Sequence, residues 1–283
     1  MRTLQGTDSA RVLRFFKKIF NGQIFMVLFP DLSFRFLRRR YQAHIKNLAG
    51  KKLPFVVRMD HGGLGDQIVW SALPEALFKK YGIKTEISSH SAFRSEEIKN
   101  FMWNGNPCVS FTSAPGITVH FPHTSKYKNY NEILLAMFGL EGPLFRMSYR
   151  PLARPDVADK VLCDLSLGPS HTFNESGTRK FWDAVAAYLT EHFKKEDIML
   201  IEPTSPYPDK RLTHYIKEKL QIPTLPVNSI NELADVLCSA KERVLLDSGS
   251  KSVAAAYGKH SVVLIRGFVN MYFKYEENDY IHL

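Results

Sequence analysis

The sequence predicts an α/β fold made of two successive Rossmann-like halves. Short apolar strands alternate with amphipathic helical stretches, which is typical of parallel sheets with helical crossovers. In each half, one strand runs directly into a glycine-bearing loop and then a helix. The segment 139–158 contains five Gly or Pro residues and little periodicity, so we expect it to join the two halves.

Composition bounds the class of protein. The chain has 283 residues, of which 45% are hydrophobic and 23% charged, values that exclude a fibrous or wholly disordered chain. The cysteines, Cys108, Cys163 and Cys238, form no C-x-x-C pair, which argues against a disulfide scaffold or a zinc knuckle. We interpret them as reduced thiols of a cytosolic protein.

No membrane-spanning or secreted segment is expected. No uncharged apolar run reaches the roughly 18 to 20 residues that cross a bilayer. The longest run near the start, Ile19–Pro30, contains Asn21, Gly22 and Gln23, and no small-residue cleavage site follows it. We therefore expect a cytoplasmic protein.

The positive charge is concentrated at the N-terminus. Residues 1–52 hold twelve of the 38 Lys and Arg residues but only two of the 28 acids, so the net charge of +10 belongs to this segment. Nucleic-acid proteins usually carry their basic stripe on the folded domain, and therefore we expect no nucleic-acid partner.

Large apolar residues are interleaved with these basic ones, from Phe15 to Phe29. Such a segment suits an anionic membrane surface, which would make the protein peripheral at the inner membrane. The alternative is a basic helical extension that packs on the core with its Arg residues in water. The sequence leaves both interpretations open.

The first half, residues 53–145, begins with a β-rich run at 55–59. After the loop 61–66, apolar residues at a spacing near 3.6 predict a helix over 67–81, which Gly82 can cap. The further elements expected in this half are a strand at 84–88, a helix at 94–103, short strands at 109–111 and 117–121, and a helix at 131–138.

The second half, residues 146–283, repeats the alternation. Ser229 and Glu232 have the spacing of a capping box at the start of a helix that ends at Ala240. The aromatic residues of 268–283 suggest a core or interdomain helix. The other elements expected are strands at 160–166, 197–202, 243–246 and 261–265, helices at 179–194, 209–220 and 253–257, a polar loop at 167–178 and a Pro-rich turn at 203–208.

The first candidate motif is the loop His61-Gly-Gly-Leu-Gly-Asp66 between a strand and a helix. Gly63 and Gly65 let the backbone approach a ligand closely, and Asp66 would stand at the helix start. The spacing fits neither the dinucleotide fingerprint nor a Walker loop. The alternative is a tight turn that Asp66 caps. His61 is a second candidate base beside this loop.

The second candidate motif is Asp247-Ser248-Gly249-Ser250-Lys251, between a strand and a helix of small residues. Backbone N–H groups at such a helix start form an anion site suited to phosphate, and Lys251 would add a positive charge. The alternative is an ordinary capped turn.

The third candidate motif joins Gly168-Pro169-Ser170 at a strand end to the nearby Arg179-Lys180-Phe-Trp182. Ser170 and Lys180 could meet a phosphate; the alternative is a surface loop with a solvated basic pair. The pair His120 and His123 lacks an accompanying carboxylate or Cys cluster, so we expect no metal site.

Taken in order, these motifs resemble a known family. Gly-Gly-Leu-Gly-Asp-Gln-Ile with Leu-Pro-Glu-Ala-Leu (62–77), Lys180-x-Trp182 and Asp-Ser-Gly-Ser-Lys (247–251) are similar to motifs of the heptosyltransferase-like glycosyltransferases, family nine. The resemblance covers about residues 54–267. It implies a GT-B fold, two Rossmann-like domains facing across a cleft, and inverting transfer of a sugar from a nucleotide donor, typically during lipopolysaccharide assembly.

The resemblance also implies roles for the site residues. Asp66 would be the general base that takes the proton of the acceptor hydroxyl. Lys180, Ser248 and Gly249 would meet the donor diphosphate, and Asp209 would stand near the nucleotide ribose. The donor-binding set is completed by Gly63, Gly65, Ser170, Asp247 and Lys251. The expected partners are a nucleotide-sugar donor and a glycan or glycolipid acceptor, with no cofactor and no metal.

The sequence also departs from the family pattern. The position five residues after Asp247, often His in the family, is Ser252, and the basic segment 1–52 precedes the usual start of the fold. Donor sugar and acceptor therefore stay open. The alternatives are a transferase with a protein acceptor and a non-catalytic nucleotide-binding or scaffold protein of the same fold.

Overall fold

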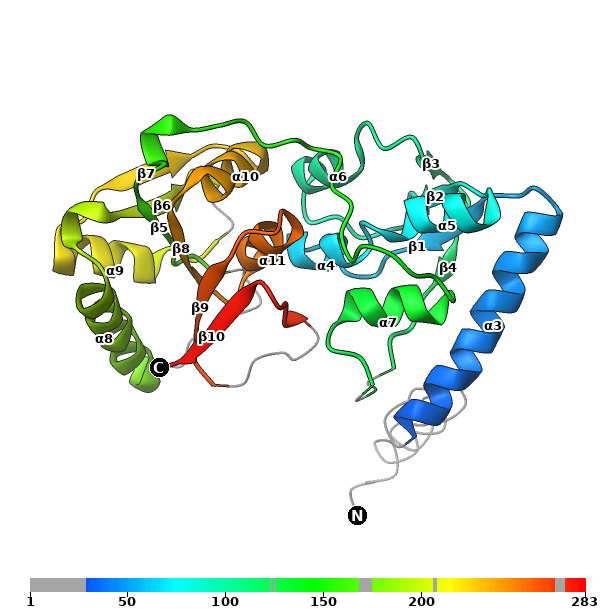
Figure 1. Cartoon of the computed structure of the whole chain (residues 1–283), viewed down its shortest axis with the longest axis horizontal. Coiled ribbons are helices and arrows are strands. Elements are labelled where there is room, and N and C mark those ends of the chain that lie inside the picture. The colour runs from blue at the N-terminus through cyan, green and yellow to red at the C-terminus, as the bar shows by residue number, and fades with distance from the viewer. Residues whose placement is uncertain (1–28, 123, 125, 168–174, 206–207, 268–272) are drawn as a thin grey trace, which may run out of the picture.

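The chain folds into an α/β protein with two parallel sheets, which confirms the predicted class (Figure 1). This computed structural model describes residues 29–122, 124, 126–167, 175–205, 208–267 and 273–283. Each sheet is surrounded by its own helices, and the two sheet-centred halves lie side by side along the longest axis of the molecule (Figure 1).

The first half is a four-stranded sheet in the order β3-β2-β1-β4, with every pairing parallel. Alternating buried and less buried residues along β1 and β2 place one set of side chains in the core. Its elements are β1 (Phe55–Arg58), α4 (Leu64–Val69), α5 (Leu73–Tyr81), β2 (Thr85–Ser88), α6 (Glu96–Trp103), β3 (Val109–Thr112), β4 (Ile117–Thr118) and α7 (Tyr130–Met137).

The second half is a six-stranded parallel sheet in the order β10-β9-β8-β5-β6-β7. Counted from β5, this is the 3-2-1-4-5-6 order of dinucleotide-binding folds. Its elements are β5 (Val161–Asp164), α8 (Glu175–His192), β6 (Ile198–Pro203), α9 (Arg211–Leu220), β7 (Thr224–Val227), α10 (Ile230–Ser239), β8 (Glu242–Leu246), α11 (Gly249–Ala256), β9 (Ser261–Ile265) and β10 (Asn278–His282).

The order in which strands are added reverses at one point in each sheet. In the first sheet this point lies between β1 and β4, and in the second between β5 and β8. Ligands of open parallel sheets bind outside the carboxyl ends of the strands at such switch points. The topology therefore marks one position in each half where a ligand site is expected.

The helix predicted over 67–81 is in fact two helices. α4 already begins at Leu64, because Gly63 is extended and its N–H is taken by the Asp66 side chain. The helix then stops at Val69, and α5 starts at Leu73. Pro74 explains the interruption, since it has no N–H to donate to the carbonyl four residues earlier and its ring crowds that turn.

The C-terminal prediction of a helix was wrong for the described residues. β10 (Asn278–His282) pairs in parallel with β9 along five residues. Tyr and Ile residues favour a strand when the edge of a neighbouring strand is available for pairing. The sequence around β10 does not by itself show that β9 offers such an edge. β7, which we did not predict, forms the opposite edge, and its exposed Pro226 is typical of an edge strand.

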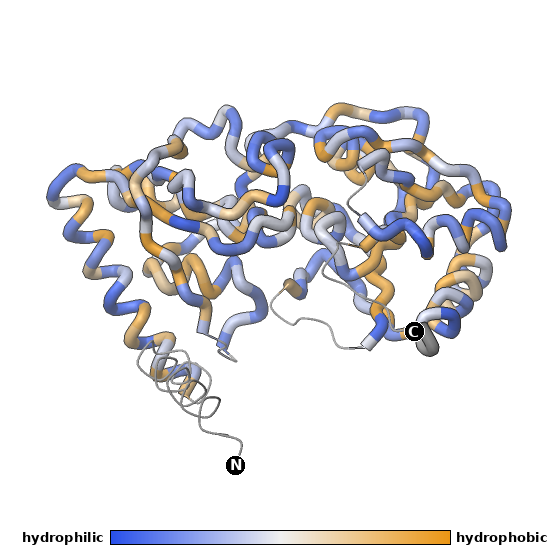
Figure 2. The backbone as a smooth tube through the Cα atoms, turned by 180° about the vertical axis from the view of Figure 1, so that it is seen from behind, coloured by the Kyte–Doolittle hydropathy of each residue, from blue (hydrophilic) through white to orange (hydrophobic). Residues whose placement is uncertain are grey.

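The described part of the basic N-terminal segment is a helix packed on the first half. α3 (Pro30–Gly50) lies against α7 and α5 at the end of the molecule, and Tyr41 stacks on Phe138 with ring centroids 5.3 Å apart (Figure 1). The tube through α3 alternates between hydrophilic and hydrophobic stretches, as a half-buried helix should (Figure 2). Residues 1–28 lie outside the described residues. No helix in the described ranges is long and apolar enough to cross a membrane.

One hydrophobic cluster extends through both halves. It contains β1 and α4 residues such as Val57 and Ile68 together with α10 and α11 residues such as Leu237 and Val253, all with at most 1% of their surface exposed. α4 packs against α11, and α6 against α10. The helices that follow the two glycine-bearing loops therefore meet at the junction of the halves.

Candidate active site

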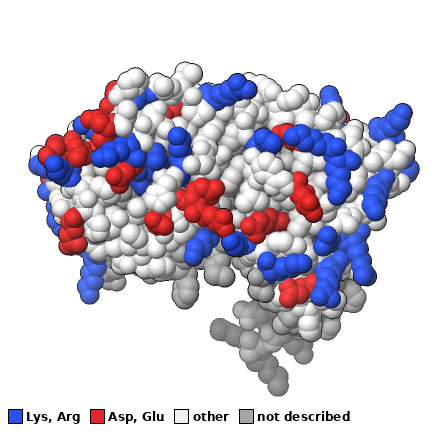
Figure 3. All heavy atoms as spheres, viewed as in Figure 1, with Lys and Arg blue, Asp and Glu red and all other residues white. Residues whose placement is uncertain are grey.

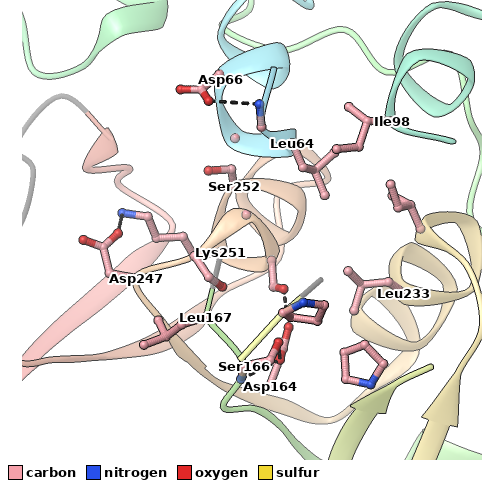
Figure 4. Close-up of a pocket in the computed structure, with 18 of the residues that line it drawn as sticks. Leu64, Asp66, Ile98, Asp164, Ser166, Leu167, Leu233, Asp247, Lys251 and Ser252 are labelled. Carbon is pink, nitrogen blue, oxygen red and sulfur yellow. Dashed lines mark hydrogen bonds and ion pairs between the residues drawn. The ribbon is translucent and has the colours of Figure 1, made fainter. Parts of the chain in front are cut away.

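A cavity of about 510 Å³ opens between the carboxyl edges of the two sheets (Figure 4). This volume is in the range of sites for small molecules. Loops after β1, β5, β6 and β8 and the first turns of α4, α10 and α11 line it. Of the residues that the sequence singled out, the cavity brings together Gly63, Gly65, Asp66, Asp247, Ser248, Gly249 and Lys251.

Asp66 is held at the start of α4 by the backbone. Its Oδ2 accepts a hydrogen bond from the Gly63 N–H at 3.1 Å. Its Oδ1 accepts none from the described part of the chain. One oxygen therefore fixes the carboxylate, while the other is available to a ligand. The predicted capping role and the predicted position at a cleft are both present.

Burial raises the pKa of the Asp66 carboxyl above its ordinary value. Nearby His61, the Gly63 N–H and Arg94 act in the opposite direction and do not cancel this effect. A carboxylate with a raised pKa is a better proton acceptor near neutral pH. Desolvation at the mouth of a cavity is thus the property of Asp66 that suits it to be a base.

Asp66 also lines a second cavity, of about 380 Å³, at the switch point of the first sheet between β1 and β4. Of these two cavities, as the described residues line them, His61 lines the second, where it is exposed. Phe273, from the C-terminal segment, is shared by both cavities. The carboxylate of Asp66 therefore stands where two ligands, one in each cavity, could meet.

The turn after β8 forms an anion site of backbone groups. Ser248 is extended, and α11 begins at Gly249, so the first N–H groups of the helix face the cavity edge. The Ser248 Oγ is buried, with no hydrogen-bond partner in the described ranges. A buried hydroxyl without a partner beside free N–H groups fits an acceptor such as a phosphate oxygen.

Lys251 does not act as the free cation that the sequence suggested. Its side chain is only 2% exposed, and its Nζ lies 2.5 Å from Asp247 Oδ1 and 2.8 Å from the Phe273 carbonyl oxygen. Burial lowers the pKa of the Lys251 ammonium, and Asp247 counteracts this. In Figure 4 Lys251 turns toward Asp247. The pair ties the motif to the C-terminal segment.

Two other predicted residues, Lys180 and Asp209, are absent from the described lining of the cavity, and a third, Ser170, lies outside the described residues. Lys180 is exposed near the start of α8 and is absent from the described lining. The Asp209 carboxylate is held by the Arg211 guanidinium, which keeps the pKa of Asp209 below its usual value. Its backbone pairs with Leu167, a lining residue, but Asp209 itself is absent from the described lining.

Sequence reasoning missed a buried carboxylate at the cavity floor. Asp164 ends β5 and is 2% exposed, and it accepts hydrogen bonds from the hydroxyls of Ser166, at 2.6 Å, and Ser250. Burial raises the pKa of Asp164, and both hydroxyls oppose this shift. An Asp at the end of an otherwise apolar strand was the available signal. Arg94 was also missed; it lines the cavity beside Gly63.

No group of three or more His, Cys, Asp or Glu residues suited to a metal ion occurs in the described ranges. Of the two His residues considered as a metal pair, His120 is exposed and lines the second cavity, and His123 lies outside the described residues.

Comparison of sequences identifies no relatives, since no protein-family profile and no curated protein matches this chain. Comparison of structures finds proteins with a similar fold. The iron-containing dodecameric glycosyltransferase TibC of enterotoxigenic E. coli H10407 superposes with a TM-score of 0.52 at 14% identity, covering 80% of this chain and 64% of TibC. This chain thus spans slightly under two thirds of the length of TibC.

Two further structures agree. The family 9 glycosyl transferase of Veillonella parvula DSM 2008 has a TM-score of 0.50 at 13% identity, over 81% of this chain and 84% of its own. TibC in complex with ADP-D-β-D-heptose, where it is described as a heptosyltransferase, has a TM-score of 0.50 at 14% identity, over 80% and 62%. The fold is that of the heptosyltransferase-like family nine glycosyltransferases, which confirms the predicted resemblance at the level of fold.

Proposed function

From this shared fold, we propose that the chain is an inverting GT-B glycosyltransferase. It would move a sugar from a nucleotide-diphosphate sugar to a hydroxyl of a glycan or lipopolysaccharide-type acceptor. One observation carries the proposal: Asp66 lines two cavities, each at the switch point of its own sheet. Two substrates bound in these cavities would meet at one carboxylate.

The donor is assigned to the larger cavity. The N–H groups at the start of α11 and the Ser248 hydroxyl would bind the diphosphate and stabilise the charge it gains as it leaves. The ADP-D-β-D-heptose bound in a TibC structure supports a nucleotide sugar as the donor class.

In the proposed reaction, Asp66 acts on the acceptor and the α11 turn on the leaving group. The acceptor hydroxyl loses its proton to Asp66 as its oxygen attacks the anomeric carbon of the donor. The bond between that carbon and the phosphate oxygen breaks, and the nucleoside diphosphate leaves with the bonding electron pair. Attack from the second cavity, on the side of the sugar opposite the diphosphate, inverts the anomeric centre.

Release of nucleoside diphosphate tests this function. The purified full chain is incubated with ADP-heptose and other nucleotide sugars, with and without lipopolysaccharide core glycans, neutral oligosaccharides or a Ser-containing peptide. We expect release only when an acceptor is present. Tight donor binding without release for every acceptor would support the scaffold alternative, and release only with the peptide would support a protein acceptor. Activity that persists in EDTA would support transfer without a metal.

We further propose that α3 places the enzyme on an anionic membrane surface. Three large apolar side chains at its N-terminal end are exposed to more than half of their surface: Phe29 (54%), directly before the helix, and Leu32 (56%) and Phe36 (62%) within it. Arg35, Arg39 and Arg40 are exposed around them. On the face in Figure 3, Lys and Arg crowd this end of the molecule, where acidic side chains are few.

Co-sedimentation with vesicles tests the membrane proposal. Each basic residue near an anionic surface contributes about 1 kcal/mol, so Arg39→Gln should weaken binding to phosphatidylserine vesicles by about fivefold. Phe36→Ser should weaken it also, whereas Phe111→Ser, at an exposed Phe outside α3, should not. Equal binding to neutral and anionic vesicles would refute the electrostatic part of this proposal.

A further inference from the structure

The lining of the second cavity combines two chemically distinct kinds of side chain. It lies outside the carboxyl ends of β1 and β4, and its lining comes from the loops after these strands, from α4 and α7, and from Phe273. Because the switch point of the first sheet falls here, a ligand is expected on topology alone. The side chains indicate which chemistry that ligand has.

The first kind is a continuous row of aromatic rings. Trp70 and Phe121 have centroids 5.8 Å apart and meet edge to face, and Phe121 contacts Tyr130 at 5.1 Å. Tyr130 in turn contacts Phe273 at 5.3 Å. Each ring is oriented by its neighbours, so the row is a rigid apolar surface. Pyranose rings carry an apolar face of C–H groups that packs on such surfaces, while their hydroxyls need polar partners.

The polar side chains of the lining are the second kind and can supply those partners. His61 and His120 are exposed at the cavity, and each ring can both donate and accept a hydrogen bond when neutral. The backbone N–H of His120 donates a hydrogen bond to the Tyr41 hydroxyl at 3.2 Å, which holds His120 in position. α3 thus supports the strand end that carries this side chain. The Asp66 carboxylate stands at the junction with the donor cavity.

The charge of the lining disfavours an anion. Arg58 is the only Lys or Arg in the described lining, and its Nε is 3.0 Å from the Asp60 carboxylate. Asp66 adds a second carboxylate, so the cavity has more negative than positive charge when its His residues are neutral. A phosphate or carboxylate on the acceptor would find its one cation already paired.

We propose that the second cavity is a subsite for an uncharged sugar ring, stacked on the aromatic row with one hydroxyl directed to Asp66. The inference rests on the proposed glycosyl transfer and specifies its acceptor: the residue that receives the new linkage is a neutral glycosyl unit, not an acidic or phosphorylated sugar.

Saturation-transfer NMR on the full chain tests this specificity. The probes are methyl glycosides of glucose, galactose and mannose, compared with methyl glucuronide and glucose 6-phosphate, each with and without nucleoside diphosphate. We expect neutral glycosides to bind and the anionic ones to bind more weakly. Preferential binding of the anionic sugars, or no binding of any neutral glycoside, would overturn the inference.

Two variants tie the binding to the cavity. Tyr130→Leu should weaken neutral glycosides by about 2- to 12-fold, the range for loss of one aromatic stacking partner, and Tyr130→Phe should retain them. Asp60→Asn frees Arg58, so it should raise the relative binding of anionic sugars by about 2- to 5-fold, as for a partly exposed ion pair.

Matched controls exist elsewhere in the chain. Phe111→Leu alters an exposed ring outside the cavity. Asp156→Asn breaks a second Arg-x-Asp pair, in which Arg154 Nε lies 2.9 Å from Asp156. Neither should change sugar preference, and an equal change in Asp156→Asn would overturn the role of Arg58.

Calorimetry with nucleoside diphosphate on the same preparation separates the two claims. If the diphosphate binds and neutral sugars do not, only the inference fails. If the diphosphate does not bind, the proposed function fails, and the sugar preference is still measured in its absence.

Discussion

At the carboxyl edge of each sheet, a strand runs into a glycine-bearing turn and a helix, and the two turns touch. A Cβ atom on Gly249 would lie 3.2 Å from the Leu64 Cβ, and one on Gly65 would lie 3.4 Å from the Ser252 Oγ. Both glycines therefore serve close approach of the two helix starts. The turns are alike in sequence pattern, and each carries one aspartate.

The two aspartates have different partners. Asp247 is locked to the buried Lys251 ammonium, whereas Asp66 accepts one backbone N–H and keeps an oxygen toward the cavities. Burial raises the pKa of the Asp66 carboxyl, which makes it a better proton acceptor near neutral pH. The contacts around each aspartate, rather than the motif, leave Asp66 as the one with an oxygen available to a ligand.

Asp66→Asn tests whether the carboxylate of the first turn acts as the base. The amide keeps the cap to Gly63 but cannot take a proton, so kcat should fall by about 10² to 10⁴-fold. Melting temperature and donor affinity should stay nearly unchanged when measured on the same preparation. If Asp66→Asn remains active and His61→Ala does not, the base is His61. Lost melting temperature with retained activity would make Asp66 a cap only.

Asp247→Asn tests whether the carboxylate of the second turn contributes to stability. Removing one partner of a buried pair typically costs about 3–5 kcal/mol, and we expect the lower end because 25% of the Asp247 side chain is exposed. Urea unfolding measures this loss, and the double variant Asp247→Asn with Lys251→Met should recover much of it. Asp279→Asn, in an exposed pair with His260, is the control and should change little. A loss of activity without a loss of stability would place Asp247 in the chemistry.

Lys180→Ala tests whether Lys180 takes part in binding the donor diphosphate. Loss of a charge-assisted hydrogen bond to the diphosphate would weaken binding of nucleoside diphosphate by about 1–3 kcal/mol in calorimetry. Lys194→Ala, at an exposed Lys beyond the other end of α8, should have no effect. Unchanged affinity in Lys180→Ala would leave the α11 turn as the phosphate site and remove Lys180 from it.

A smaller effect is expected in how activity and stability depend on pH through Asp66. Because burial raises the pKa of Asp66, kcat/KM should fall on acidification at a pH above the ordinary Asp value near 4. The sign for stability is opposite: a raised pKa favours the protonated folded protein, so the contribution of Asp66 is present at low pH and is lost as pH rises through that pKa. Asp66→Asn should remove this slope. An acid limb at or below pH 4 would contradict the assignment.

Local patterns predicted most of the fold. The strand–loop–helix order placed Gly63 and Asp66 correctly at a cavity because glycine spacing and the following apolar periodicity are short-range signals. The burial of Lys251 was not foreseen, since its contact with the Phe273 carbonyl oxygen involves a segment 22 residues further along the chain. β10 was missed for the same reason: its partner strand is distant in sequence.

The site was predicted less completely than the fold. Asp164 was missed because its importance arises from burial between two hydroxyls of different segments. Lys180 was chosen from a resemblance of motifs, and the described cavity does not include it. Side chains that meet only after folding are not visible in the spacing of one segment.

The shared hydrophobic cluster has a consequence for how this molecule melts. Separate domains with small polar interfaces can unfold in separate steps, but here α4 packs against α11, so separating the halves would expose apolar residues such as Ile68 and Val253 to water. The two sheets should then lose structure together, in a single calorimetric transition whose van't Hoff and measured enthalpies agree. The packing of α4 against α11 would also limit how far the two halves can separate, so a ligand would enter the cavities while the halves stay in contact.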